Sequence, residues 1–548
     1  MYKRRRYICG ILACIIGLAG CRTDEKKKDL EQSEREYARV SLFCDVEFWK
    51  PPVWDTAEDT ITGEISQKTG LALDIYVPVQ DADTQLSLML VNDNLPDLIS
   101  VTDSTVTSQL VSSGKVWNLE EFLKQYKPDS HLLHEFPEDI KKELIKRDGG
   151  WYVLPSHLNS EDAREMWKPR EKCYEDLVKY EDNNAIIWNK ALLEEAGLSV
   201  EELTTEQQVM AALEKVKNMH LQVEGQEVIP LLVDGTDYQN HTLKFLQWSF
   251  GAEYVDAQGN YRDIFRQPET RDALSFLNRA VRNLYITPEQ FTMENDQIKS
   301  LIASQRVLCF IGNIANTSFN PMQWVSSGPV FSESGKTPVL GKNCRASTGW
   351  IGTFVSKSCS NPEETAAFID YMTSEEGMLF WEYGFEGIHY IRDEEGHVIR
   401  TEEGEQDRNA YSQSGLGAWW MFANTAWSRS VLPPIEKGSV DEADQRIRTA
   451  YGSNSRTVLF DLSLLNAPVD SREEDSEQES GEPQINAWKK SQVLKMILAD
   501  TDEAFEEEFQ TFCSTLKELG IETLEKKKDE NYKKNCQEYG EVIQKVNG

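Results

Sequence analysis

The amino-acid sequence predicts an α/β protein with two large lobes, and two observations carry this prediction. Beyond an N-terminal leader, short apolar runs alternate with helix-like segments, which is typical of βαβ units and a mainly parallel sheet. Of the 548 residues, roughly 510 follow the N-terminal leader and the charged tether behind it, and a chain of that length is too long for a single hydrophobic core. We therefore expect two lobes of mixed helix and strand.

Apolar spacing sets the expected elements of the first lobe. Residues 40–44 and 95–101 are short apolar runs, and residues 71–77 alternate, so all three segments predict strands. Residues 60–70 predict a helix closed by its final glycine, and residues 83–91 return to helical spacing. The resulting order of strand, helix, strand, helix and strand gives the first βαβ units of the chain.

The middle and the end of the chain are expected to be rich in helices. Thr204 and Gln207 have the spacing of a capping box ahead of an apolar helical pattern. Residues 268–284 carry apolar positions at helical spacing, and Asn361 opens another helix as its N-cap. From Trp488 onward the chain is amphipathic and helical in pattern.

The N-terminus has the features of an exported lipoprotein. A basic cluster at 3–6 precedes an apolar run at 8–20, which at about 13 residues is shorter than the roughly 20 that a membrane-spanning helix needs. The run ends in Leu18-Ala19-Gly20-Cys21, which resembles a bacterial lipobox. We expect a signal peptide over 1–20, lipidation of Cys21, and a charged tether over 21–37 that holds the protein at the extracellular face of the cell membrane. The alternative is an ordinary signal peptide with a chance cysteine.

The charge and the cysteines exclude several classes of function. The chain has 58 basic and 92 acidic residues, so its surface repels phosphate backbones and we expect no nucleic-acid partner. Beyond Cys21 seven cysteines are scattered without a C-x-x-C motif, and we expect mostly buried thiols, with one or two disulfides left open as an alternative. The seven histidines are scattered as well, so a zinc site is not expected.

Several motifs of the mature chain together resemble those of the extracellular solute-binding proteins of bacterial ABC importers, in the large lipoprotein branch typical of Firmicutes. The segment 65–99 resembles the first βαβ unit of that family, and Ile187 to Gly197 resembles one of its helix starts. Asp148-Gly-Gly-Trp-Tyr-Val-Leu-Pro155 and Tyr383-Gly-Phe-Glu-Gly-Ile-His-Tyr390 are similar to two further motifs. Phe385 and Ile388 depart from the family pattern.

The resemblance implies a two-lobed periplasmic-binding-protein (type II) fold with hinge crossovers and a ligand cleft. Lobe 1 is expected over 38–155 plus 335–425, and lobe 2 over 156–334 plus 426–548. The acidic, serine-rich stretch 470–483 is expected to be a disordered insertion within lobe 2. The implied protein is a monomer that binds a small molecule or an oligosaccharide and delivers it to the permease subunits of an ABC transporter.

Candidate ligand-binding residues follow from the chemistry of sugars, which present flat C–H faces and hydroxyl edges. Such ligands pair with aromatic platforms and with carboxylate or amide partners, and in open α/β sheets they bind at the carboxyl ends of strands. The structural alternative for each aromatic residue is a place in a core. The candidates are Glu47, Trp54, Asp103, Trp248, Trp350, His389, Tyr390, Trp419 and Trp420.

No cofactor and no metal site is predicted. Some relatives of the resembled family hold calcium in an acidic loop, and here Asp234, Asp237 and Asn240 share one loop. The loop lacks the complete spacing of a calcium-binding loop, so a structural calcium ion has no support in the sequence.

Two further functions compete with a non-catalytic binding protein. A surface sensor subunit would report its ligand to a membrane kinase, and a surface glycosidase would use two carboxylates held roughly 5–10 Å apart. Carboxylates are abundant throughout this chain, so their presence alone favours no enzyme, and no G-x-S-x-G motif supports another hydrolase.

Overall fold

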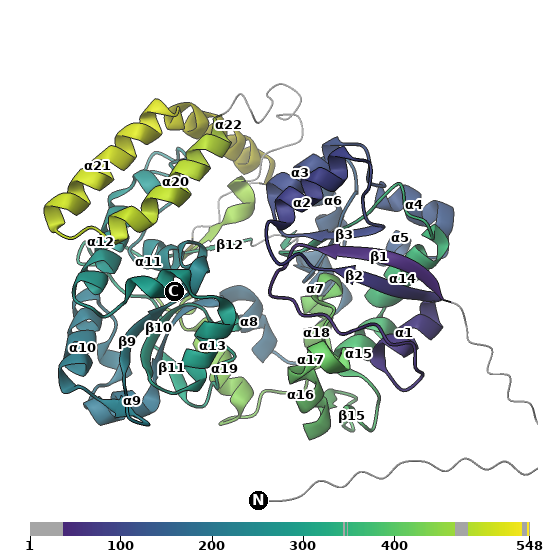
Figure 1. Ribbon diagram of the computed structural model, residues 1–548, viewed down its shortest axis with the longest axis horizontal. Coiled ribbons are helices and arrows are strands. Elements are labelled where there is room, and N and C mark those ends of the chain that lie inside the picture. The colour runs from purple at the N-terminus through teal and green to yellow at the C-terminus, as the bar shows by residue number, and fades with distance from the viewer. Residues whose placement is uncertain (1–36, 344–345, 348, 466–480, 540–544, 547–548) are drawn as a thin grey trace, which may run out of the picture. The chain divides into compact units, whose positions relative to one another are not determined.

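The computed structural model describes residues 37–343, 346–347, 349–465, 481–539 and 545–546 (Figure 1). The predicted signal peptide, Cys21 and most of the tether lie outside these ranges, as do residues 470–480 of the predicted insertion. The last residues of that insertion are described, and they open helix α20 (Glu482–Ile497), with Pro483 in its first turn. Proline is favoured there because its missing N–H would have no partner inside the helix.

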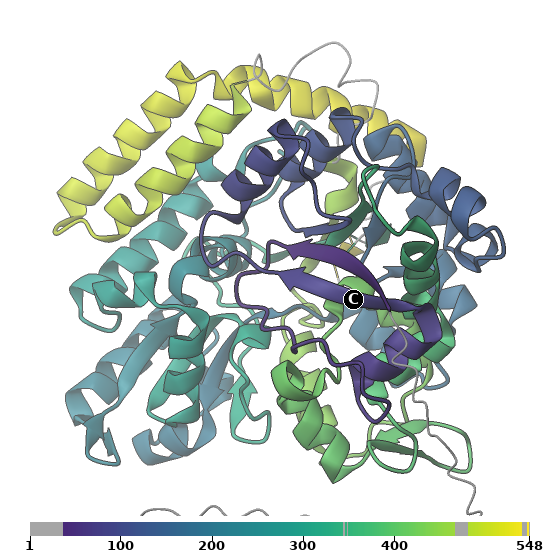
Figure 2. The same cartoon turned by 45° about the vertical axis from the view of Figure 1, so that its right-hand side comes forward.

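The first lobe contains a five-stranded sheet in the order β2-β1-β3-β14-β4, of which β1 and β2 are the purple strands in Figure 2. β1 is parallel to both β2 and β3, and β14 runs antiparallel to β3 and β4. The bounds of these strands are Ala38–Cys44 for β1, Leu71–Tyr76 for β2, Leu98–Val101 for β3, Leu154–Pro155 for β4 and Gly352–Val355 for β14. The predicted α/β class is confirmed, with a mixed rather than a purely parallel sheet.

The helices α1 (Ile61–Thr69) and α2 (Ala82–Val91) connect the three parallel strands as predicted. Thr60 caps α1 because its side chain accepts a hydrogen bond from the Gly63 amide. Gly70 ends the helix with a φ of 75°, a conformation that glycine adopts without a steric penalty. The other long helices of this lobe are α3 (Ser104–Ser112), α4 (Leu119–Tyr126), α6 (Glu138–Asp148), α14 (Pro362–Thr373) and α15 (Glu375–Tyr383).

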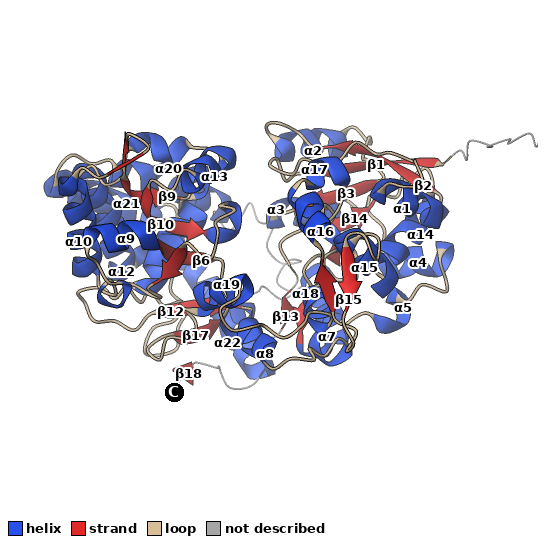
Figure 3. Ribbon diagram, turned by 90° about the horizontal axis from the view of Figure 1, so that it is seen from below, coloured by secondary structure: helices blue, strands red, loops and turns tan. Residues whose placement is uncertain are grey.

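The second lobe contains a four-stranded mixed sheet in the order β11-β6-β10-β9, and helices pack around it (Figure 3). The bounds of its strands are Asn184–Asn189 for β6, Ile229–Val233 for β9, Val307–Asn313 for β10 and Trp324–Ser326 for β11. Its helices include α10 (Glu206–Met219), α12 (Pro268–Arg282), α13 (Asn295–Ala303), α21 (Asp502–Glu518) and α22 (Ile521–Tyr539).

A capping box opens α10, one residue later than predicted. The N-cap is Thr205, and its partner three positions on is Gln208. The sequence Thr204-Thr-Glu-Gln-Gln offers the same spacing in two registers, so the pattern alone could not choose between them.

Along the described residues, packing changes from one hydrophobic core to the other three times, between Trp167 and Tyr180, between Leu340 and Ile351, and between Val431 and Tyr451. The expected lobe bounds stay a prediction, and at three places the packing lies outside them. Leu158 and Trp427 pack in the first core. Leu340, in β12 (Val339–Lys342), packs in the second. β12 pairs with β17 (Val458–Asp461), which pairs in turn with β18 (Lys545–Val546).

The six described cysteines carry free thiols. The prediction of mostly buried thiols holds for two of them, Cys44 and Cys309, which are fully buried, and burial raises the pKa of the Cys44 thiol to about 12. The remaining four described thiols are half-buried, and Cys344 lies outside the described ranges. Among the helices of those ranges, none combines the length and the apolar character that crossing a membrane requires.

Candidate functional site

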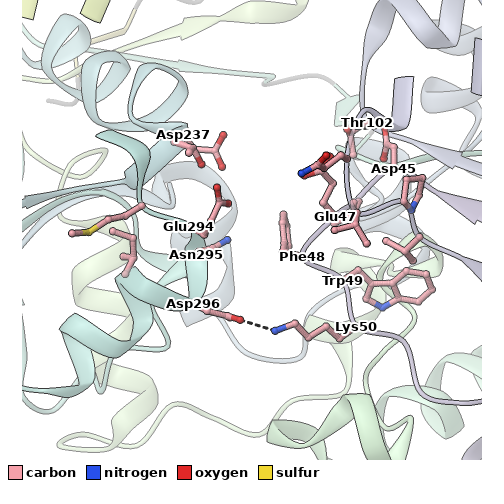
Figure 4. Close-up of a pocket in the computed structure, with 18 of the residues that line it drawn as sticks. Asp45, Glu47, Phe48, Trp49, Lys50, Thr102, Asp237, Glu294, Asn295 and Asp296 are labelled. Atoms are coloured by element: carbon pink, nitrogen blue, oxygen red, sulfur yellow. Dashed lines mark hydrogen bonds and ion pairs between the residues drawn. The ribbon is translucent and has the colours of Figure 1, made fainter. Parts of the chain in front are cut away.

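A cavity of about 750 Å³ lies between residues of the two lobes (Figure 4). From the first lobe it is lined by residues 45–50, residues 77–80 and Thr102. From the second lobe it is lined by Asp234, Thr236 and Asp237 and by part of the segment 293–298, and Trp350 on the connecting chain completes it. We call this cavity the cleft.

Strand ends place the first-lobe residues in the cleft. The segment 45–50 follows β1, and Thr102 follows β3, so both leave the sheet at the carboxyl ends of neighbouring parallel strands. Across from them, Asp234 follows β9, and the segment from Glu294 to Asp296 starts α13. The cleft therefore lies between the carboxyl ends of two strands of the first lobe and, in the second lobe, the end of β9 and the N-terminus of α13.

Aromatic rings form an exposed surface on the first-lobe side. Phe48 and Trp350 are 39% and 43% exposed, and their rings stack with 6.3 Å between centroids and 8° between planes. Trp420 lies beside Phe48 at 6.2 Å, and Tyr411 lies 5.3 Å from Trp420. Large exposed apolar rings cost solvation free energy, and stacked rings of this kind match the flat C–H face of a pyranose.

Carboxylates of both lobes face this space. Asp45 accepts hydrogen bonds from the amide and hydroxyl of Thr102 through Oδ2, while its buried Oδ1 has no partner among the described residues. Burial raises the pKa of Asp45 to about 6. Burial also raises the pKa of Glu47, and repulsion from Glu294 on the other lobe adds to that rise.

One ion pair crosses the cleft directly. Lys50 Nζ lies 2.6 Å from Asp296 Oδ2, and Figure 4 shows the pair joining the two lobes. The pair raises the pKa of Lys50 and lowers that of Asp296, since each charge favours the ionised form of the other.

Of the residues predicted for ligand binding, the structure brings Glu47 and Trp350 to the cleft and Trp420 to its aromatic surface. Asp103 is exposed next to Thr102, yet its carboxylate accepts hydrogen bonds from the amides of Thr105 and Val106 and caps α3. Asp103 is not among the residues that line the cleft.

Trp54 and His389 line a different cavity, of about 720 Å³, within the first lobe. Trp54 Nε1 donates a hydrogen bond to Ser66 Oγ. His389 is 9% exposed, its Nδ1 accepts from the Phe385 amide, and its Nε2 lies 3.2 Å from Asp407. These two polar side chains have partners within the fold and do not reach the cleft.

Three predicted aromatic residues need correction, because they lie in hydrophobic cores. Trp419 has no exposed surface and packs against Trp49 and Trp54, with centroid distances of 6.1 and 5.4 Å. Trp248 and Tyr390 are 2% and 4% exposed. None of the three presents a ring face to a ligand. Of the neighbouring tryptophans Trp419 and Trp420, only Trp420 can therefore serve as a platform for a sugar.

Most residues of the cleft were not predicted for ligand binding. Phe48 neighbours Glu47 after β1, and its position at a strand end was the available signal. Lys50, Glu294 and Asp296 were also missed, and Asp237 was considered only for calcium. Glu294 and Asp296 give no local signal, because their role depends on which surface of the second lobe faces the first.

The acidic loop considered for calcium is used for internal contacts. Asp234 is 3% exposed, and its Oδ2 accepts from the Asn313 amide and lies 2.7 Å from His241 Nδ1. Within the described ranges the group that could hold a metal ion is Asp393, Glu395 and His397, in a turn outside the cleft. There His397 Nδ1 already lies 2.7 Å from Asp393.

A two-lobed fold with an aromatic and acidic cleft is that of a solute-binding protein, and the chain belongs to the bacterial extracellular solute-binding protein family. The family model matches residues 66–379. Among individual proteins, the chain is 21% identical to a polygalacturonan/rhamnogalacturonan-binding protein, YtcQ, of Bacillus subtilis (strain 168), over 94% of this chain and 97% of that protein.

Solved structures support the same fold. The ABC-transporter substrate-binding protein FusA of S. pneumoniae, in complex with kestose, aligns with a TM-score of 0.65 at 16% identity, over 92% of this chain and all of that one. The alginate-binding protein AlgQ2 aligns with a TM-score of 0.64 at 13% identity, over 90% of this chain and 98% of that one. The predicted family and the two-lobed fold are confirmed.

Proposed function

We propose that this protein captures an oligosaccharide in the cleft and delivers it to the permease of an ABC transporter. The observation that carries the proposal is the exposed, stacked pair of Phe48 and Trp350, set among carboxylates in a space lined by both lobes. Stacked rings bind pyranose faces, and the carboxylates accept hydrogen bonds from the hydroxyls around them. YtcQ is named for binding polygalacturonan and rhamnogalacturonan, and the FusA structure is a complex with kestose, and both agree with this proposal.

The proposal describes binding without turnover. A ligand that touches both lobes stabilises their closed arrangement, and that arrangement is what a permease can recognise. We expect a bound oligosaccharide to be recovered intact after prolonged incubation with the protein. Chromatography that shows cleaved products would favour the glycosidase alternative instead.

Calorimetric titration against a panel of plant and host oligosaccharides tests the binding directly. We expect at least one glycan to bind, and the variant Trp350→Ala to weaken its binding at least tenfold. The matched control is Trp167→Ala, a half-buried tryptophan outside the cleft whose Nε1 donates to Glu375. Equal affinity of both variants for the glycan would contradict the assignment of the cleft.

We propose further that the protein is anchored through a lipid on Cys21. A single-residue change, Cys21→Ser, should move the protein from the membrane fraction to the medium and abolish labelling by a fatty-acid precursor. Retention in the membrane fraction would show that another element holds it there.

A further inference from the structure

The described lining of the cleft has a one-sided charge. Six of its residues are acidic and one is basic, and that one, Lys50, already pairs with Asp296. The described lining includes no arginine and no histidine. The acidic residues are Asp45, Glu47, Asp234, Asp237, Glu294 and Asp296.

Three of these carboxylates form no ion pair with a described residue. Asp234 contacts the Asn313 amide and His241, Asp45 accepts from Thr102 through Oδ2, and Asp296 pairs with Lys50. The three are Glu47, Asp237 and Glu294, of which Glu294 is also the N-cap of α13 in a capping box with Gln297. Figure 4 shows Glu47 on one side of the cleft and the other two on the opposite side.

Like charges therefore face one another across the space that the ligand enters. Burial raises the pKa of Glu47, and repulsion from Glu294, Asp81 and Asp83 adds to that rise, in agreement with the acidic lining of the cleft. Because carboxylates line both sides, a further negative charge placed between the lobes would be repelled from both. Hydroxyl groups, in contrast, donate hydrogen bonds to these oxygens without adding charge.

We propose that the cleft selects saccharides that carry no carboxylate groups, and that Glu47, Asp237 and Glu294 set this specificity. The proposal rests on the function proposed above and narrows its ligand class. It separates this chain from a binder of polyuronates, although a relative with 21% identity is named for polygalacturonan binding. At that identity the likeness carries the fold, while charge in the cleft decides the ligand.

The test uses pairs of ligands that share a sugar skeleton and differ in the presence of carboxylate charge. Each neutral oligosaccharide of the panel is compared with the same molecule after oxidation of its primary hydroxyls to carboxylates. Each oligogalacturonate is compared with its methyl ester, which keeps the skeleton and removes the charge. We expect the uncharged member of every binding pair to bind at least tenfold more tightly to the full-length protein in a chelator-containing buffer.

Variants assign the effect to the three residues. The triple variant Glu47→Gln, Asp237→Asn and Glu294→Gln should bring the affinities of the two members to within about threefold. The control removes the same number of charges from exposed residues outside the cleft, with Glu121→Gln, Glu138→Gln and Glu195→Gln, and should leave the tenfold preference unchanged. An unchanged preference in the triple variant would overturn the assignment to these residues. If the triple variant fails to fold, the three single variants replace it, and each is expected to reduce the preference in part.

Salt gives an independent readout on the unmodified protein. If the carboxylated member is repelled, raising the ionic strength screens the repulsion and tightens its binding. Binding that weakens with salt would reveal attraction and overturn the proposal, as would tighter binding of the carboxylated member, with or without added Ca²⁺. If no member of any pair binds, the proposed function itself fails, which is a different result from a reversed preference.

Discussion

Lys50 and Asp296 come from different lobes and form an ion pair over the cleft, with 2.6 Å between Lys50 Nζ and Asp296 Oδ2. Their side chains are 63% and 67% exposed, so water and salt screen the interaction. The pair can form only while the two lobes face each other at this separation, so it reports their relative position more than it adds to stability.

We expect Lys50→Ala to weaken ligand binding modestly. An exposed pair contributes about 0–1 kcal/mol, which corresponds to a loss of affinity of up to about fivefold, and the thermal midpoint should hardly change. Titration calorimetry of both single variants and of the double variant with Asp296→Ala gives the coupling energy. Lys124→Ala, which breaks an exposed pair within α4, serves as the control. A loss beyond tenfold would mean that Lys50 contacts the ligand itself.

Trp350 and Trp419 should respond to alanine in opposite ways. Trp350 is 43% exposed, so Trp350→Ala should lower affinity and leave the free energy of unfolding nearly unchanged. Trp419 is fully buried, and Trp419→Ala should lower the free energy of unfolding by about 3–5 kcal/mol. Denaturant titration of each variant measures this difference. A stable Trp419→Ala variant with impaired binding would contradict its place in the core.

Asp45 should make the protein less stable as the pH rises. Its folded-state pKa of about 6 lies above the ordinary value of 3.8, so the folded state binds more protons than the unfolded state between these values. Stability therefore falls through this window as the pH rises. Asp45→Asn should raise the free energy of unfolding at pH 7 by about 1–2 kcal/mol and have little effect below pH 4.

Asp97 gives the control with the opposite sign. Hydrogen bonds from Ser41 and Ser360 hold the pKa of Asp97 below its usual value, so its charge stabilises the folded state at neutral pH. Asp97→Asn should destabilise the protein at pH 7, and the difference should shrink as the pH falls below about 4. Denaturant titrations of both variants across this range would refute the assignment if the two pH profiles had the same sign.

Gly349 holds the segment that carries Trp350. It has a φ of 64°, and a Cβ atom there would lie 1.8 Å from the Ser156 carbonyl oxygen. Gly349→Ala should therefore displace the segment and reduce ligand affinity, while Gly114→Ala, at φ 67° with open space around it, should cost only the backbone strain of about 1–2 kcal/mol. Thermal unfolding and titration of both variants separate the two effects. Equal behaviour of both would show that the close contact with Ser156 is relieved easily.

Apolar spacing and capping residues predicted the helices and strands well, because both depend on residues that are close in the sequence. Residues 40–44 were expected as a strand and lie within β1, and the helix expected over 60–70 is α1, with Thr60 and Gly70 at its ends. The one-residue error at α10 has a local cause too, since two overlapping capping boxes are written in the same five residues.

The site was predicted only in part, because exposure and lobe pairing are not local properties. Glu47 and Trp350 reach the cleft, whereas Trp419 lies in the core. The sequence around a tryptophan does not show whether its side chain is buried or exposed. Glu294 and Asp296 meet the first lobe through the arrangement of the two cores. No spacing along the chain encodes that meeting.

β1 separates the point of attachment from the site of binding. The compact body begins at Ala38, where β1 starts, while Asp45 and the cleft follow its other end, about 20 Å away at the rise of an extended strand. The lipid proposed for Cys21 would thus join the chain at the end of β1 remote from the cleft. Separation of Lys50 and Asp296 on opening would take place at the end of that strand where no attachment interferes.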